Sequence, residues 1–134
     1  MSRTDLALRM AEQKLMCPTC GTRHDAHKVL IVITDGSPSR ESEPMDKVTA
    51  QLKKDGVAIF TVGVGKISEK GLEKIASEPV LDHMVNLVSK TYLEHSNQLL
   101  AHLVCRSAKM FEEEFQKNLQ FGERHAVWQP QILF

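Results

Sequence analysis

The hydrophobic positions of this chain fall into short continuous runs separated by helically spaced sets. Residues 29–33 and 57–62 form two continuous runs rich in β-branched side chains. Such runs are typical of parallel strands that are covered on both faces. Residues 83–88 form a weaker third run. The pattern therefore predicts three strands.

In the remaining segments, the apolar residues recur at the intervals of an α-helix. Over residues 4–16, Leu8, Ala11 and Leu15 share one face, and Thr4 is placed to cap the first turn. Two further helices are expected over residues 44–54 and after Ser68, the second ending at Pro79. A capping-box pattern at residues 91–94 opens a last, long helix. Its apolar stripe consists of Leu93, Leu100, Val104, Ala108, Phe111 and Phe115.

Strands that alternate with helices predict an α/β fold. We expect a Rossmann-like doubly wound sheet, incomplete, with about three parallel strands flanked by helices. Ligands of such sheets bind beyond the carboxyl ends of the strands, where Asp35 follows the first run. Residues 1–106 are predicted to form this unit, and residues 107–134 a helical extension with an irregular tail.

Composition excludes several classes of function. The chain holds 17 basic and 17 acidic residues, scattered along its length, so nucleic acid is not an expected partner. Its apolar runs are strand-sized, too short to span a bilayer, and the N-terminus lacks a signal-peptide pattern. The count of 3 cysteines is odd, which excludes a complete disulfide framework and leaves the compartment open. We find no nucleophile and base pattern that would predict an enzyme.

Three motifs together resemble the von Willebrand factor type A family. They are KVLIVITDG at residues 28–36, QLKKDGVAIFTVGVG at residues 51–65 and LEKIASEP at residues 72–79. The resemblance runs from about Thr4 to about Cys105 and is nearest to the extracellular collagen, integrin and matrilin branch. It implies a protein-binding or cell-adhesion module that contacts extracellular matrix or cell-surface protein. It also implies that the family's first strand would lie upstream of residue 1.

The resemblance further implies a metal-ion-dependent adhesion site at the upper edge of the sheet. In the family, a first strand supplies Asp-x-Ser-x-Ser, a second loop supplies Thr, and a third supplies the Asp of Thr-Asp-Gly. By position, Asp35 matches the third piece and Thr4 the second, while Ser37 and Ser39 are candidate hydroxyl ligands. Asp35, Gly36 and Ser37 are the implied partner contacts.

Two other interpretations of these residues are open. Residues 35–39 also satisfy Asp-x-Ser-x-Ser, but only one helix separates them from the next strand, which disagrees with the family's first strand. Alternatively, Asp35 only ends a strand and Thr4 only caps a helix. Magnesium and manganese require near-octahedral oxygen ligands, and a single carboxylate is a poor set. We therefore expect Mg²⁺ or Mn²⁺ binding to be weak or absent.

A second candidate site lies between the first helix and the first strand. Cys17, Cys20, His24 and His27 offer four zinc-type ligands, and the Cys-Pro-x-Cys-Gly pattern resembles a zinc knuckle. A local disulfide and an unliganded loop are the alternatives. If these residues bind zinc, the chain is a small zinc-binding module. A chain without metal could instead be an intracellular assembly scaffold.

Location and assembly follow from the same resemblance. The parent protein is expected to be extracellular or secreted; because this chain shows no signal-peptide pattern, a cytoplasmic location is the alternative. We expect the chain to be a truncated product or short isoform. Without the first strand, residues 29–34 would leave an apolar sheet edge, through which the chain could associate with itself.

Overall fold

The computed structural model describes residues 3–35, 44–87 and 91–120. The helices are α1 (Thr4–Met10), α2 (Met45–Lys54), α3 (Glu69–Ile75), α4 (Val80–His83) and α5 (Thr91–Gln120). The strands are β1 (Val29–Thr34), β2 (Ala58–Val64) and β3 (Met84–Leu87). A π-helical turn, η1 (Ala11–Leu15), and a 3-10 turn, η2 (Pro18–Cys20), follow α1.

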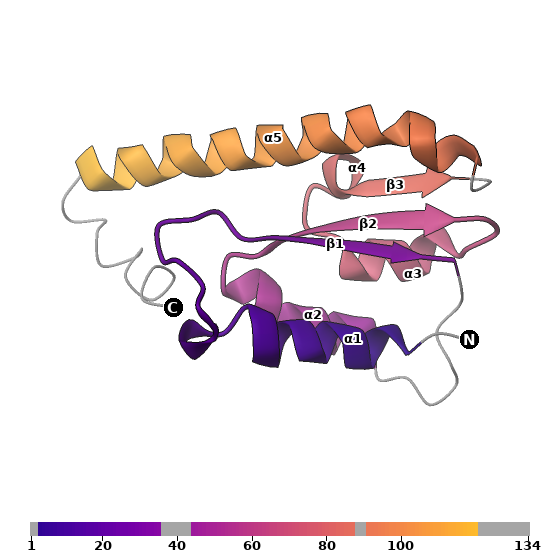
Figure 1. Cartoon of the computed structure of the whole chain (residues 1–134), viewed down its shortest axis with the longest axis horizontal. Coiled ribbons are helices and arrows are strands. Elements are labelled where there is room, and N and C mark those ends of the chain that lie inside the picture. Colours follow the sequence, from indigo (N-terminus) through magenta and orange to yellow (C-terminus); the bar gives the residue numbers. More distant parts are fainter. Residues whose placement is uncertain (1–2, 36–43, 88–90, 121–134) are drawn as a thin grey trace.

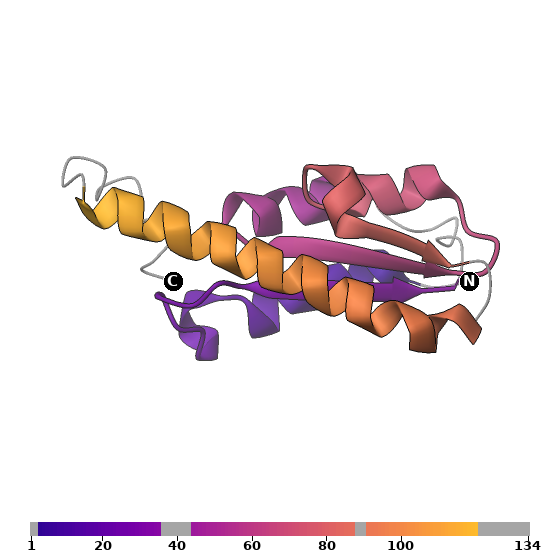
Figure 2. The same ribbon diagram turned by 90° about the horizontal axis from the view of Figure 1, so that it is seen from above.

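The three strands form one parallel sheet in the order β1-β2-β3. The β1–β2 register runs from Val29 opposite Ala58 to Thr34 opposite Gly63. Helix α5 lies on one side of the sheet, and α1 and α2 lie on the other (Figures 1 and 2). The predicted α/β fold, a doubly wound sheet of three parallel strands flanked by helices, is therefore confirmed.

One core cluster fills the space between the sheet and the first two helices. Leu8 of α1 and Leu52 of α2 are buried there against Ile59 of β2. The side chains of Leu30 and Val32 reach the same cluster from β1. Full burial of each such aliphatic side chain stabilises the fold by about 1.5–3 kcal/mol relative to exposure.

A second cluster lies on the other face of the sheet and fixes α5. Val62 and Val64 of β2 and Val85 of β3 are buried, and Leu100 and Leu103 of α5 pack against them. Val62 and Val64 belong to the carboxyl half of β2, and Leu100 and Leu103 to the first half of α5. This half of α5 is therefore held by apolar burial.

Strand β1 differs from the expectation of a strand covered on both faces. Leu30 and Val32 pack against the first cluster, but Ile31 is 42% exposed and Ile33 is 57% exposed. The reason is that α5 packs over β2 and β3 in the second cluster, which contains no β1 residue. A continuous apolar run does not reveal that one face of the strand is open.

The first helix also departs from its prediction at both ends. Leu8 and Ala11 are buried as expected, but Leu15 is 59% exposed, and Met16 contacts the core instead. The π-helical turn η1 places more residues in each turn than an α-helix, which rotates the later positions. At the other end, Arg3 is the N-cap residue, and no side-chain cap hydrogen bond is formed there, so the proposed capping role of Thr4 is wrong.

The segment from β2 to β3 differs from the sequence-based expectation in its helix caps and helix ends. Ser68 is the N-cap residue of α3 as expected, but its side chain makes no cap hydrogen bond. Helix α3 ends at Ile75, before Pro79, and Pro79 instead precedes the short helix α4. Gly63 lies inside β2, where its missing side chain allows a close approach: the side chains of Leu72 and Ile67 leave no room for a Cβ atom.

Helix α5 continues without interruption through residue 106, the predicted boundary between the domain and its extension. The division into residues 1–106 and 107–134 remains a prediction, and residues 121–134 lie outside the described part of the chain. Within the described residues, no helix is long and apolar enough to cross a membrane.

Candidate functional site

The carboxyl edge of the sheet holds the candidate metal site. Asp35 directly follows β1 and is exposed, and Thr4 begins α1 with a half-buried side chain. The end of β1 and the start of α1 lie at the same end of the molecule (Figures 1 and 2). The fold thus brings these two predicted residues to one end, in adjacent layers. Gly36, Ser37 and Ser39 lie outside the described residues.

Next to Thr4, the buried carboxylate of Asp5 is paired with an arginine side chain. Asp5 is only 2% exposed, and both of its oxygens accept hydrogen bonds from the Arg3 guanidinium, at 3.0 Å from Nε and 2.8 Å from the terminal nitrogen. A guanidinium matches a carboxylate in this two-point geometry. The Arg3–Asp5 pair therefore balances the negative charge that burial makes costly. Sequence analysis missed this pair, although two opposite charges at i and i+2 beside a helix start were visible.

The donors at this edge fit a divalent cation poorly. A near-octahedral oxygen site needs several converging carboxylate and hydroxyl ligands. Among the described residues, no three His, Cys, Asp or Glu side chains are grouped so that they could hold a metal ion. Asp35 and Thr4 alone supply one carboxylate and one hydroxyl.

The four candidate zinc ligands are not brought together. Cys17 and Cys20 form a disulfide across η2, as in one of the two alternatives to zinc. His24 is exposed, and the His27 ring contacts α5 through Ser107 and Phe111. Cysteines in a disulfide are not thiolate ligands, so a four-ligand zinc site requires both a reduced pair and a different position for His27.

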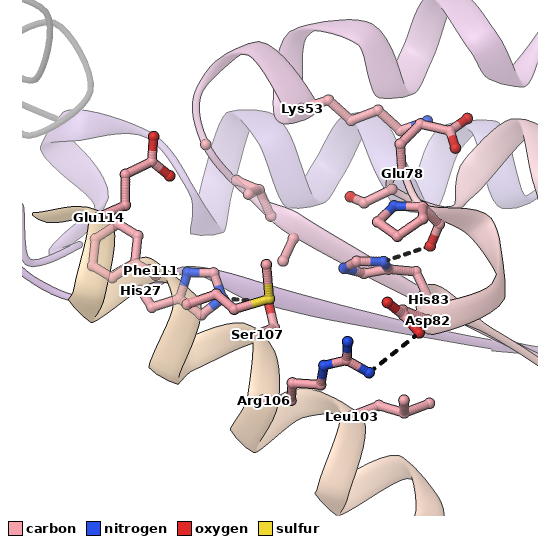
Figure 3. A pocket seen from close by; sticks show the side chains of 16 residues that line it. His27, Lys53, Glu78, Asp82, His83, Leu103, Arg106, Ser107, Phe111 and Glu114 are labelled. Atoms are coloured by element: carbon pink, nitrogen blue, oxygen red, sulfur yellow. Dashed lines mark hydrogen bonds and ion pairs between the residues drawn. The ribbon is translucent and has the colours of Figure 1, made fainter.

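An open groove of about 670 Å³ lies at the opposite, amino-terminal end of the sheet. Its lining includes Val57 and Ala58, where β2 begins, and Met110 of α5. Arg106, Ser107 and Phe111 of α5 also face the groove (Figure 3). Charged side chains line its margin: Lys53, Glu78, Asp82, Arg106 and Glu114. Asp82 and Arg106 form an ion pair of 3.6 Å across it.

His27 lies in this groove as a link between distant segments. Its Nε2 atom is 2.9 Å from Ser107 Oγ, and its ring stacks on Phe111 with centroids 4.9 Å apart (Figure 3). Its Nδ1 atom is buried and has no hydrogen-bond partner in the described structure. Burial and, second, the charge of nearby His83 lower the pKa of His27. His27 is therefore a packing residue that favours the neutral form.

His83 lies in the same groove, just before β3. Its Nδ1 atom is 3.0 Å from the Pro79 carbonyl oxygen, and its ring packs against Phe60 of β2 at a centroid distance of 4.6 Å. The sequence pattern grouped His27 with Cys17, Cys20 and His24 and gave no sign that His27 and His83 share a groove. The groove could not be found from local sequence, because its lining residues come from distant segments; His27 and Ser107, for example, lie 80 positions apart.

Comparison with known proteins agrees with the fold and with the motifs. The family model of the von Willebrand factor type A domain matches residues 1–98. Matrilin-1 of Gallus gallus is 32% identical over 105 residues, covering 76% of this chain and 21% of that protein. The collagen alpha-1(XII) chain of Oryctolagus cuniculus is 30% identical over 122 residues, covering 90% of this chain and 19% of that protein. The chain thus spans about a fifth of the length of these relatives.

A solved structure has the same fold. It is proximal thread matrix protein 1 from the mussel byssus, described with a zinc-occupied MIDAS motif, and it superposes with a TM-score of 0.70 at 22% identity. The match covers 78% of this chain and 26% of that one. Together with the family model, the relatives and the motif order, this likeness identifies the chain as a member of the von Willebrand factor type A domain family, of the matrilin and collagen branch.

Proposed function

We propose that this chain is a protein-binding module for extracellular matrix or cell-surface protein, and that it contacts its partner through the carboxyl edge of the sheet. The observation that carries this proposal is Asp35. It belongs to a Thr-Asp-Gly motif, directly follows strand β1 and is exposed. The matrilin and collagen relatives support a role in binding without catalysis.

We expect the partner to contact mainly protein atoms of this edge, because binding of a divalent cation there is expected to be weak or absent. Asp35 and Thr4 would contact Mg²⁺ or Mn²⁺, with Ser37 and Ser39 as further hydroxyl ligands. The cation would leave one coordination position for a carboxylate of the partner. The mussel relative is described with zinc in its MIDAS motif, so zinc belongs in the same test.

An extracellular location of the parent protein is part of this proposal. Disulfides persist in oxidising compartments, and the Cys17–Cys20 pair supports such a compartment. Free thiols at both positions would instead favour the alternative, an intracellular assembly scaffold without metal.

Metal binding is tested by titrating ¹⁵N-labelled protein with Mg²⁺, Mn²⁺ or Zn²⁺ while recording amide spectra. We expect changes at Asp35 and Thr4 only at millimolar concentrations. Unchanged signals at these two residues would reject the cation site and leave a metal-free binding surface. Asp25→Ala is the matched control for Asp35→Ala, since Asp25 is also exposed but lies at the other end of β1.

Partner binding is tested with fibrillar collagen and with matrilin-1 immobilised on a sensor surface. We expect saturable binding that Asp35→Ala weakens by at least about tenfold, equivalent to ~1.4 kcal/mol, while Asp25→Ala leaves it unchanged. Equal binding by both variants would exclude Asp35 from the contact. An absence of binding to either protein would reject the matrix-binding proposal for these partners.

A further inference from the structure

The groove at the amino-terminal end of the sheet is built partly by residues that follow the family resemblance. The family model matches residues 1–98, whereas one wall of the groove consists of α5 side chains between Leu103 and Glu114. With a volume of about 670 Å³, the groove lies within the range of about 300–1,000 Å³ that is usual for ligand-binding clefts. It lies at the other end of the sheet from Asp35, so it is a second candidate contact surface.

Much of the lining of the groove is apolar. Met110 is 57% exposed, and its flexible side chain can adapt to the shape of a partner. An apolar side chain of a partner would therefore find apolar surface to cover. The apolar residues of the lining are Val57, Ala58, Pro79, Leu103, Met110 and Phe111.

The charged side chains of the groove leave one carboxylate in excess. Asp82 and Arg106 form an ion pair of 3.6 Å. Burial lowers the pKa of Lys53, and the negative charge of Glu78 acts in the opposite direction, so these two groups lie close enough to attract each other. Glu114 is exposed, and within the described chain no ion pair involves its carboxylate. The charge of Glu114 is therefore available to a partner.

His83 provides a second acceptor in the groove. Its Nδ1 atom is 3.0 Å from the Pro79 carbonyl oxygen, which can only accept, so the neutral ring carries its proton on Nδ1. The Nε2 atom of the neutral ring is then an acceptor, and no hydrogen bond of the described chain uses it. The His83 ring points into the groove, and Glu114 lies at the other end (Figure 3). The groove thus combines an apolar lining with two available acceptors.

We propose that this groove binds an extended segment of a partner protein in which a basic residue stands next to an apolar one. The cationic group of the basic residue pairs with Glu114, and its apolar stem packs on Met110. The apolar neighbour covers the rest of the lining, and an N–H group of the segment donates to His83 Nε2. An acidic segment is disfavoured, because it brings a second negative charge next to Glu114. This contact is separate from the one proposed for the carboxyl edge.

A titration of the isotope-labelled 134-residue chain with two end-blocked pentapeptides tests this proposal. One is Gly-Leu-Arg-Leu-Gly, and the other, Gly-Leu-Glu-Leu-Gly, carries the opposite charge. We expect the arginine peptide to shift the Met110 methyl and His83 ring signals at millimolar concentrations, and the glutamate peptide to leave them unchanged. Asp35→Ala should bind the arginine peptide as the unmodified chain does. This variant separates the groove from the carboxyl edge, whatever the outcome there.

Replacement of Glu114 isolates the charge. Glu114→Gln should raise the dissociation constant of the arginine peptide about twofold to fivefold, as expected for one exposed ion pair. Glu113→Gln is the matched control and should bind as before, because Glu113 is an exposed neighbour that does not line the groove. His83→Phe keeps a ring against Phe60 but loses the acceptor, and it should weaken binding by a similar factor.

Several results would overturn the proposal. They are an absence of shifts with the arginine peptide, equal shifts with both peptides, and an equal loss of binding in Glu113→Gln and Glu114→Gln. Met110 signals that move with protein concentration before any peptide is added would assign the groove to a second copy of the chain. Nuclear Overhauser effects between Met110 and residues 121–134 of the same chain would assign it to the chain's own end.

Discussion

His27 Nε2 lies 2.9 Å from Ser107 Oγ and so joins the segment before β1 to the second half of α5. The stacking of the His27 ring on Phe111 extends this contact, and Phe111 in turn stacks with Phe115 one turn later. Among the described side chains of α5, those that pack on the apolar cluster over β2 and β3 are Leu100 and Leu103, both in its first half. The contact with His27 is therefore a principal link between the second half of the helix and the sheet.

Stability should fall as this histidine gains a proton. The pKa of His27 is lowered from its ordinary value of 6.5, so the unfolded chain binds more protons than the folded chain as the pH falls through that value. The contribution is complete above about pH 6.5 and decreases below it, until the folded form is also protonated. We expect His27→Phe, which retains an aromatic ring, to remove this part of the pH dependence. Urea unfolding between about pH 7.5 and pH 5.5 measures it.

His24→Gln is the control for that comparison, because it also removes an imidazole, but at an exposed position. Replacement of His83 provides a second test, since the charge of His83 helps to lower the pKa of His27. His83→Gln should raise the pKa of His27 toward 6.5 in an NMR titration of the ring. If the slopes of the unmodified chain and His27→Phe are identical, His27 titrates normally and the interpretation is wrong.

Gly63→Ala should destabilise the fold, because the new Cβ atom would lie 2.5 Å from Leu72 Cδ1 and 2.7 Å from Ile67 Cγ2. Leu72 is buried and cannot move freely, so we expect a loss of about 1–3 kcal/mol in the free energy of unfolding. Gly71→Ala is the control. Gly71 lies in α3 with its nearest neighbour 4.0 Å away, and alanine there should stabilise by about 0.5–1 kcal/mol. Equal effects at the two positions would contradict the close packing of β2 on α3.

Removal of Arg3 should cost stability, because it leaves the buried Asp5 carboxylate without its two guanidinium hydrogen bonds. Arg3 is partly exposed, and solvent screens the pair, so we expect Arg3→Ala to lose only about 1–2 kcal/mol. Arg23→Ala, at an exposed position, should change the free energy of unfolding by less than about 0.5 kcal/mol. A double-mutant cycle with Asp5→Asn isolates the pair, and a coupling energy near zero would contradict it.

The cysteines should give one reactive thiol per chain without reductant and three after reduction. Cys105 is exposed and free, whereas Cys17 and Cys20 are paired. A chromogenic thiol assay on denatured protein measures both numbers, and elemental analysis should find zinc well below one equivalent. Three thiols before reduction, together with one equivalent of zinc, would support the zinc-binding alternative. Three thiols without zinc would support the intracellular scaffold.

The strands and the family were predictable because their signals are local. The β-branched runs of β1 and β2 and the order of the glycines and Asp35 along the chain predict parallel strands and the type A family. Local periodicity predicted the wrong burial where the backbone departs from a regular α-helix, as at the exposed Leu15, which ends the π-helical turn. It also missed α4, since four residues are too few to produce a periodic pattern.

Local signals along the chain were thus enough to predict the α/β class, the three parallel strands and the position of Asp35 at a carboxyl edge. Three features became visible only in the folded chain: the contact of His27 with Ser107, the burial of Asp5 with Arg3, and the exposure of Ile31 and Ile33. This division arises because periodicity and strand propensity act between near neighbours in the chain. Burial and side-chain partners depend on which distant segments, such as β1 and α5, come to lie over one another.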